Sequence, residues 1–231
     1  IEDGFSLSIE LLNQFIRWVA KQDSFLFTEI PFSRAKLIAL YVVIFAAVGL
    51  WKQKTKTAVF AALLSIILYL TVMQIDRKNY MYNELVLFHV NRTSLIGVKQ
   101  GTALTVLTDD TVATANKYPL TPYRTATGIA TTSVNELPSL FAFDGTDIMV
   151  IDSLGIYNTE IRQPIVLLIQ SPKINLDRLI ETLNPRMILA DGSNYTSYVN
   201  RWSATCTKRK LPFHHTGTKG AFTLKIAETL N

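Results

Sequence analysis

Histidine and cysteine are the scarcest of the side chains that could do chemistry in this 231-residue chain. The histidines are His89, His214 and His215, and Cys206 is the only cysteine. No H-x-H-x-D-H or H-E-x-x-H run and no cysteine pair occurs, so the sequence predicts no metal site. His214 and His215 are adjacent, and neighbours on a strand point to opposite faces, so both cannot enter one site there. A structural or polar role is therefore favoured for all three histidines.

The loop Asp191-Gly192-Ser193-Asn194 has the most site-like position in the chain. It follows an apolar run typical of a strand and precedes a run typical of a helix. Ligands bind at the carboxyl ends of strands in open α/β sheets. The same residues also have a structural interpretation, in which Asp-Gly makes the turn and Ser193 or Asn194 caps the next helix. Both interpretations stay open, and the structural one is preferred.

A basic cluster is the other candidate for binding. It consists of Lys208, Arg209 and Lys210, with Arg201 upstream on the same expected helix and Lys219 beyond it. Such cations can hold phosphates, although cations at a helix end also favour the helix dipole. The formal charge of +5 is modest and permits an anionic partner without requiring one.

The elements that would position these residues fall into two regions. Charged residues make up 18% of the chain, against about a quarter in soluble domains, and this shortage excludes a disordered chain. Two apolar runs, at about 34–52 and 57–75, are long enough to span a membrane. Between them, residues 52–57 carry three lysines, and the positive-inside rule places this turn in the cytoplasm. Everything after Asp76 would then face outward.

Residues 5–30, ahead of the two apolar runs, show apolar side chains at helical spacing. Charged and amide side chains fall between the apolar ones, so an amphipathic helix is predicted, ending before Pro31. The chain begins with Ile1 rather than Met. We therefore expect a piece of a longer protein with further membrane helices upstream.

After residue 78 the sequence predicts a mixed α/β (α+β) domain of short strands and helices. Strands are expected at 85–90, 103–108, 148–151, 165–169, 187–190 and 221–227, with a hairpin over 139–151 and helices at 176–183 and 195–208. From residue 165 onward, strands alternate with helices, which predicts βαβ units and a partly parallel sheet that ends with strand 221–227. Residues 109–137 are rich in threonine and without period, so a loop or irregular strand is expected there.

The stretch from 164 to 226 resembles the end of the ComEC family of competence DNA-uptake channels. In that family a polytopic membrane domain precedes a metallo-β-lactamase-like domain. The chain matches the family framework at Pro185, Gly192 and Asn194, and then at Thr216 and Gly220-Ala221. The resemblance implies a membrane part over 1–78 and a shortened lactamase-like sheet-and-helix domain over 79–231.

The departures from the family pattern imply a lost metal site. Where the family has His-His-Gly-Ser, this chain has Gln170-Ser171-Pro172-Lys173, and the Asp-Val-Gly-Gln-Gly-Asp run reads His89-Val90-Asn91-Arg92-Thr93-Ser94. One acidic position is retained, at Asp152, and a single carboxylate cannot hold two metals. The resemblance makes the following residues remnants of the family site: Asp152, Gln170, Ser171, Lys173, Asp191, Asn194 and His215.

These observations favour one hypothesis over two others. The chain would be the end of an inner-membrane channel for single-stranded DNA, with an inactive domain on the outer, periplasmic side that guides DNA or supports the channel. It would need no cofactor, and its partners would be DNA, the lipid bilayer, other helices of the same channel and other competence proteins. A second hypothesis is a membrane-anchored hydrolase or nuclease with a non-standard site. It requires Asp152, Ser171, Lys173, Asp191 and His215 to converge within hydrogen-bond reach. A third is a membrane-anchored binding module unrelated to DNA.

Overall fold

The computed structural model describes residues 2–20, 32–109 and 118–225. The chain divides into two compact units, residues 1–30 and 31–231. The first unit contains helix α1 (Glu2–Ala20). Its described apolar side chains are exposed, and the rings of Phe15 and Trp18 stack with centroids 6.0 Å apart. The predicted helix is thus present as far as Ala20, and residues 21–30 of the prediction lie outside the described residues.

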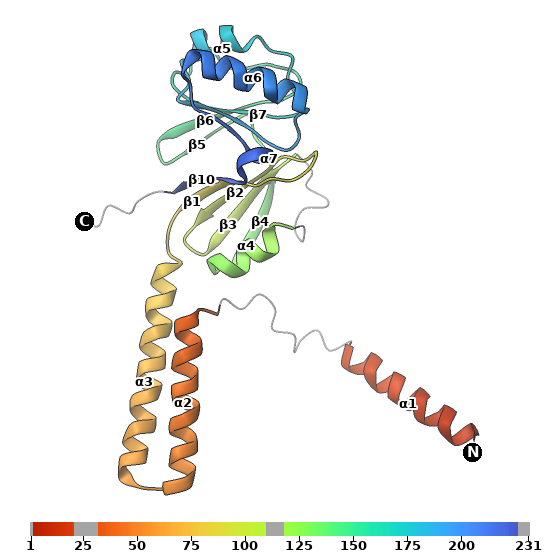
Figure 1. The fold of residues 1–231 in the computed structure, drawn as a ribbon, viewed down its shortest axis with the longest axis vertical. Helices are drawn as coiled ribbons and strands as arrows, with labels where there is room; N and C mark the ends of the chain where they lie inside the picture. The colour runs from red at the N-terminus through yellow and green to blue at the C-terminus, as the bar shows by residue number, and fades with distance from the viewer. Residues whose placement is uncertain (1, 21–31, 110–117, 226–231) are drawn as a thin grey trace. The chain divides into compact units, whose positions relative to one another are not determined.

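The second unit begins with a helical hairpin. Helices α2 (Arg34–Gln53) and α3 (Lys56–Asn79) are each long and apolar enough to cross a membrane. Only 6% of the most apolar window of each helix is buried, whereas the core helix of a soluble domain would be mostly buried. Side-chain oxygens of Ser33 and Thr55 cap the two helices. Figure 1 shows the hairpin extending away from the sheets, with its turn at the far end.

The remainder of the second unit is a sheet-and-helix domain, as predicted. Its strands and helices, in chain order, are β1 (Glu84–Leu87), β2 (Leu95–Gln100), β3 (Ala103–Thr108), α4 (Leu120–Thr127), β4 (Thr131–Glu136), β5 (Leu140–Phe143), β6 (Thr146–Ile151), β7 (Ile165–Leu168), α5 (Leu176–Leu183), β8 (Met187–Ala190), α6 (Thr196–Arg209), β9 (Phe213–His215), α7 (Thr216–Lys219) and β10 (Phe222–Lys225). We call the sheet ordered β10-β1-β2-β3-β4 sheet A, and the sheet ordered β5-β6-β7-β8-β9 sheet B.

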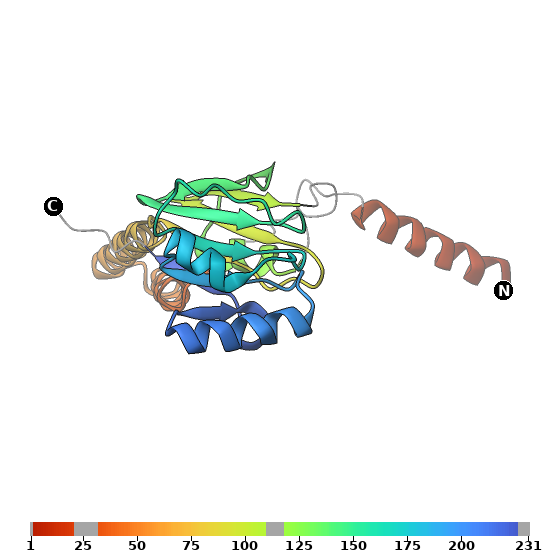
Figure 2. The same ribbon diagram turned by 90° about the horizontal axis from the view of Figure 1, so that it is seen from above.

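The domain buries apolar side chains on both faces of each sheet. In β1, Leu85 and Leu87 face sheet B, while Val86 packs on the other side with Leu120 of α4. Strand β7 likewise divides its side chains between sheet A and helices α5 and α6. Figures 1 and 2 show α5 and α6 side by side on the outer face of sheet B. Because both faces are covered, these strands appear in the sequence as continuous apolar runs rather than as alternating ones.

Sheet B confirms the predicted hairpin and parallel pairing, but its last strand differs from the prediction. Strands β5 and β6 pair antiparallel, and β6 to β9 are parallel. The strand that follows α6 in this sheet is β9, whereas β10, within the predicted 221–227, pairs antiparallel with β1 of sheet A. The short α7 and Gly220, at a φ of 79°, separate β9 from β10.

The prediction of an irregular segment over 109–137 is wrong for most of its described part. Helix α4 and strand β4 lie there, and β4 pairs parallel with β3. Pro122 is the third residue of α4, where a proline removes no internal helix hydrogen bond. Leu120 anchors the helix, since its side chain is fully buried. Gly128 ends the helix in the left-handed conformation.

Candidate functional site

The loop after β7 lies at the carboxyl edge of sheet B and carries three of the predicted remnant residues, Gln170, Ser171 and Lys173. Gln170 and Ser171 have φ angles of 55° and 57°, a conformation that non-glycine residues seldom adopt. The Gln170 backbone N–H donates to Ser193 Oγ at 2.8 Å, and the Ser171 N–H donates to Asn194 Oδ1 at 2.8 Å. The loops after β7 and β8 therefore hold each other in place, as residues on adjacent parallel strands can.

The loop after β8 both accepts hydrogen bonds from the loop after β7 and donates to it, and it is also hydrogen-bonded internally. Asp191 Oδ1 accepts from the backbone N–H of Ser193 and from the side chains of Ser193 and Asn194. Asn194 Nδ2 also donates to the Leu168 carbonyl at 2.7 Å. The expectation that Ser193 or Asn194 caps α6 is wrong. The residue before α6 is Tyr195, and its N–H donates across to Ser171 Oγ at 2.8 Å.

Asp191 is fully buried. Desolvation raises its pKa, and the hydroxyls of Ser193 and Ser94 oppose that rise. Its second oxygen, Oδ2, and Ser94 Oγ each lack a hydrogen-bond partner of normal geometry among the described residues. Asp191 is thus buried with Oδ1 accepting three hydrogen bonds and Oδ2 accepting none of normal geometry among the described residues.

Asp109 links the two sheets at this edge and was not predicted as a site residue. It directly follows β3, within the segment expected to be irregular. One of its carboxylate oxygens accepts from the Ser94 backbone N–H at 3.1 Å and the other from Gln170 Nε2 at 3.0 Å. The sequence feature that could have identified Asp109 is its position, as an acidic residue directly after the apolar strand predicted at 103–108. The remnant position Asp152 lies beside this network, and its Oδ1 accepts from the Leu154 N–H.

The histidines lie beside the same loops. His89 Nδ1 shares a 3.1 Å hydrogen bond with Thr216 Oγ1. His215 Nδ1 is buried without a described partner, and desolvation, with smaller contributions from His89 and His214, lowers the pKa of His215. His214 instead donates from Nε2 to the Gly220 carbonyl. His214 and His215 thus make separate contacts.

Gly192 is required by close contact with the segment that follows β1. A Cβ added there would lie 2.3 Å from the Val90 carbonyl oxygen and 3.0 Å from the His89 ring. The Gly192 carbonyl also accepts from the Arg92 N–H at 3.0 Å. The framework glycine that the sequence shares with the ComEC family thus has a packing role here.

The residues at this edge of the sheets do not form the site that the hydrolase or nuclease hypothesis requires. No cluster of three or more histidine, cysteine, aspartate or glutamate side chains suited to a metal ion occurs within the described ranges. The non-standard hydrolase site required five residues to converge: Asp152, Ser171, Lys173, Asp191 and His215. In the described part of the chain, no hydrogen bond or ion pair joins any two of these five.

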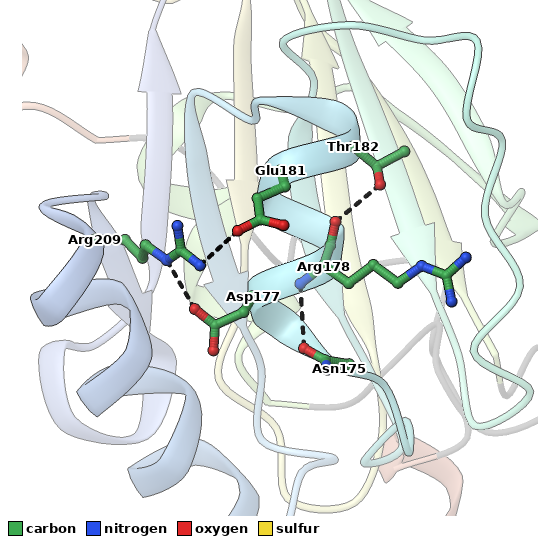
Figure 3. Close-up of polar contacts among 6 residues, drawn as sticks. All are labelled: Asn175, Asp177, Arg178, Glu181, Thr182 and Arg209. Carbon is green, nitrogen blue, oxygen red and sulfur yellow. Dashed lines mark hydrogen bonds and ion pairs between the residues drawn. The ribbon is translucent and has the colours of Figure 1, made fainter.

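Arg209 of the basic cluster is already paired. Its Nε donates to Asp177 at 2.7 Å and a terminal nitrogen donates to Glu181 at 2.8 Å, both on α5 (Figure 3). These hydrogen bonds, the one to Asp177 first, raise the pKa of Arg209. Asn175 caps α5 by accepting from the Arg178 N–H, which fixes the turn that carries Asp177. The Arg209 guanidinium therefore ties α6 to α5.

Two other predicted cations share a surface cavity. Lys173 and Arg201 line an open groove of about 520 Å³ together with the rings of Tyr198 and Trp202. The Arg201 guanidinium lies 4.7 Å from the Tyr198 ring centroid. Lys173 was predicted as a remnant residue and Arg201 as a DNA contact, and the fold places both beside one groove. Lys219, by contrast, donates from Nζ to the Phe213 carbonyl.

Comparison with known proteins gives one result. The model of the family described as the ComEC C-terminal domain matches residues 85–226. No curated protein and no solved structure matches the chain. The matched residues cover more than half of the chain and include both sheets and all the loops described above. The chain therefore belongs to the ComEC family of competence DNA-uptake proteins, and it carries the C-terminal domain of that family.

Proposed function

We propose that this chain is the end of an inner-membrane channel for single-stranded transforming DNA. Residues 1–78 would be its last membrane elements, and residues 79–231 would be a shortened lactamase-like domain that does not cleave DNA. Family membership supports the DNA-uptake role, and the two apolar helices support the membrane location. The three lysines at the far turn favour a cytoplasmic turn, with the domain on the outer side of the membrane.

The observation that carries the non-catalytic role is the hydrogen bonding of the loops after β7 and β8. A hydrolytic site needs a nucleophile with its base, or a metal with its water. Here Ser171 Oγ accepts from the Tyr195 N–H. Asn194 uses its amide on Ser171, Asp191 and Leu168. Polar groups at the remnant positions thus hydrogen-bond to one another. This arrangement favours a structural role for these loops over a catalytic one.

The groove lined by Lys173 and Arg201 is the best candidate for contact with DNA. Single-stranded DNA is held by cations that follow its backbone and by aromatic rings on which bases stack. Lys173 and Arg201 are exposed, and the half-buried Tyr198 supplies an aromatic ring beside them, whereas Trp202 is buried beneath the groove. Arg209 contributes less to this surface because its charge is paired with Asp177 and Glu181. Lys208, Lys210 and Lys219 would extend the positive surface beyond the groove.

The test is binding of a fluorescent single-stranded oligonucleotide to the full chain in detergent across a salt series. We expect binding that weakens steeply with salt, since phosphate contacts release counterions. Arg201→Ala and Lys173→Ala should each weaken binding at least severalfold. Arg178→Ala is the matched control, because this exposed side chain extends away from Arg209 (Figure 3) and lines none of the groove. No binding at low salt would contradict the guiding role.

A second arm of the same experiment tests catalysis. Labelled single-stranded and double-stranded DNA are incubated with the chain and added zinc or manganese, and the products are separated by size. We expect both substrates to remain intact at every metal concentration. Cleavage that requires the metal and is lost in Asp191→Asn would contradict the non-catalytic proposal and support the hydrolase hypothesis.

A further inference from the structure

We propose that the cavity where the helical hairpin meets sheet A binds an anionic phospholipid, with an acyl chain in its apolar part and the phosphate on Arg77. This inference depends on α2 and α3 crossing a membrane. It does not depend on DNA binding or on the lack of catalysis in the domain.

The cavity has a volume of about 390 Å³ and lies at the end of α3 nearest the sheets. Its walls are mainly apolar, formed by Leu70 and Met73 of α3 and the ring of Tyr80, with Gly128 at the end of α4. Gln74 and Arg77 are among the polar residues that line it. An apolar cavity beside membrane-spanning helices suits a hydrocarbon chain, and the arginine suits a charged headgroup.

The wall formed by Tyr80 is held in place by the sheet domain. Lys99 is fully buried, and its Nζ donates to the Tyr80 carbonyl at 2.6 Å and to the Tyr82 carbonyl at 3.0 Å. The Tyr80 ring also lies against Gly128, where an added Cβ would be 2.8 Å from the ring. Because Tyr80 is fixed at both its backbone and its ring, the cavity is formed before any ligand arrives.

The charges at this site favour an anion at Arg77. Lys36 also lines the cavity, but its ammonium lies 3.3 Å from Asp76 in an ion pair between α2 and α3. The Arg77 side chain makes no hydrogen bond or ion pair with any residue that the structure describes. A guanidinium matches a phosphate through two parallel hydrogen bonds. A free phosphate would leave the apolar walls unused, whereas a phospholipid would occupy both parts of the cavity.

The test uses the full chain in detergent micelles, titrated with phosphatidylglycerol or phosphatidylcholine. Bound lipid is counted by native mass spectrometry, and the shift in melting temperature is measured in parallel. We expect preferential binding of phosphatidylglycerol, and a loss of at least about tenfold in that preference in Arg77→Gln, the size expected for charge-assisted hydrogen bonds. Lys78→Gln is the matched control, because it makes the same charge change one residue away but does not line the cavity.

A second variant tests the acyl part of the site. Met73→Trp should fill the cavity and reduce the binding of both lipids, while Ile75→Trp should not, because Ile75 is on the same helix but does not line the cavity. Equal losses in Arg77→Gln and Lys78→Gln would mean general attraction to charge and would overturn the proposal. Competition by glycerol phosphate as strong as that by phosphatidylglycerol would also overturn it. Lipid binding that persists in a chain that fails to bind DNA would leave this inference standing while contradicting the DNA-guiding proposal.

Discussion

Asn194 connects the ends of two neighbouring strands, since its Oδ1 accepts a 2.8 Å hydrogen bond from the backbone N–H of Ser171. The same side chain donates to the carbonyl of Leu168, the last residue of β7. One asparagine thus satisfies both an N–H and a C=O that would otherwise lose their partners at the edge of sheet B. Asn194 matches the family framework, and these hydrogen bonds give that match a structural explanation that does not depend on what the domain binds.

Asn194→Ala should destabilise the chain. It leaves the Ser171 N–H and the Leu168 carbonyl without their partner, and each unsatisfied group costs about 1–3 kcal/mol. We expect the free energy of unfolding to fall by about 2–4 kcal/mol in chemical denaturation of the full chain in detergent. The control is Asn200→Ala on the exposed side of α6, which should change stability by less than about 0.5 kcal/mol. Equal losses in the two variants would contradict the role assigned to Asn194.

Asp191→Asn should alter how stability depends on pH. The pKa of Asp191 is raised in the folded chain by desolvation, whereas in the unfolded chain it is about 3.9. Between these two values the folded chain binds more protons, so the free energy of unfolding falls as pH rises through this window. The penalty is absent below the unfolded value and complete above the folded one. The asparagine carries no charge, so the fall should be smaller in Asp191→Asn than in the unmodified chain.

Ser94→Ala gives the opposite change at the same site. The Ser94 hydroxyl lowers the pKa of Asp191, so its removal should raise that pKa further and widen the pH window over which stability falls. Both predictions are checked by measuring the chemical denaturation midpoints of the two variants and of the unmodified chain between pH 4 and pH 8. A pH profile that is the same in Asp191→Asn and in the unmodified chain would show that this carboxyl does not titrate differently on folding.

Lys99→Met should weaken the joint between the hairpin and sheet A. The substitution removes the donor for the carbonyls of Tyr80 and Tyr82 and the contact between Nζ and the Tyr82 ring, at 3.6 Å from its centroid. We expect a loss of about 2–4 kcal/mol in the free energy of unfolding. Lys225→Met is the control, because that side chain is 63% exposed and pairs with Glu84 only at 3.6 Å. It should cost less than about 1 kcal/mol.

Gly192→Ala should disturb the strand-end loops by steric contact. The new Cβ would lie 2.3 Å from the Val90 carbonyl oxygen, and backbone atoms must move to relieve the contact. We expect a cost of about 1–3 kcal/mol, as for overpacking in a core, together with changed amide chemical shifts around Arg92. Gly49→Ala, where no atom lies within 4 Å of the added Cβ, should cost nothing measurable. A neutral Gly192→Ala would show that the loops adjust freely.

Much of the fold follows from local sequence patterns. The two apolar runs predicted helices α2 and α3, because length and lack of charge are properties of consecutive residues. Helix α5 and strands β3 and β8 match their predicted ranges. The two strands are apolar runs bounded by turn residues, and the helix ends at Asn184-Pro185. Strand β2 was missed because Gly97 and Lys99 interrupt its pattern. Gly97 lies against the ring of Phe88 and Lys99 is buried on backbone carbonyls, both contacts with residues outside the strand.

The sequence by itself determined the hairpin of two long apolar helices and the parallel βαβ order. Tertiary structure alone decided that β10 joins sheet A rather than sheet B, because strand pairing depends on residues far apart in the chain. It also decided which polar residues meet. Gln170 reaches Asp109 across 61 positions of sequence, and Lys173 and Arg201 share a groove that no spacing rule predicts. Periodicity describes neighbours along one element, whereas these contacts arise only when two sheets and their loops pack together.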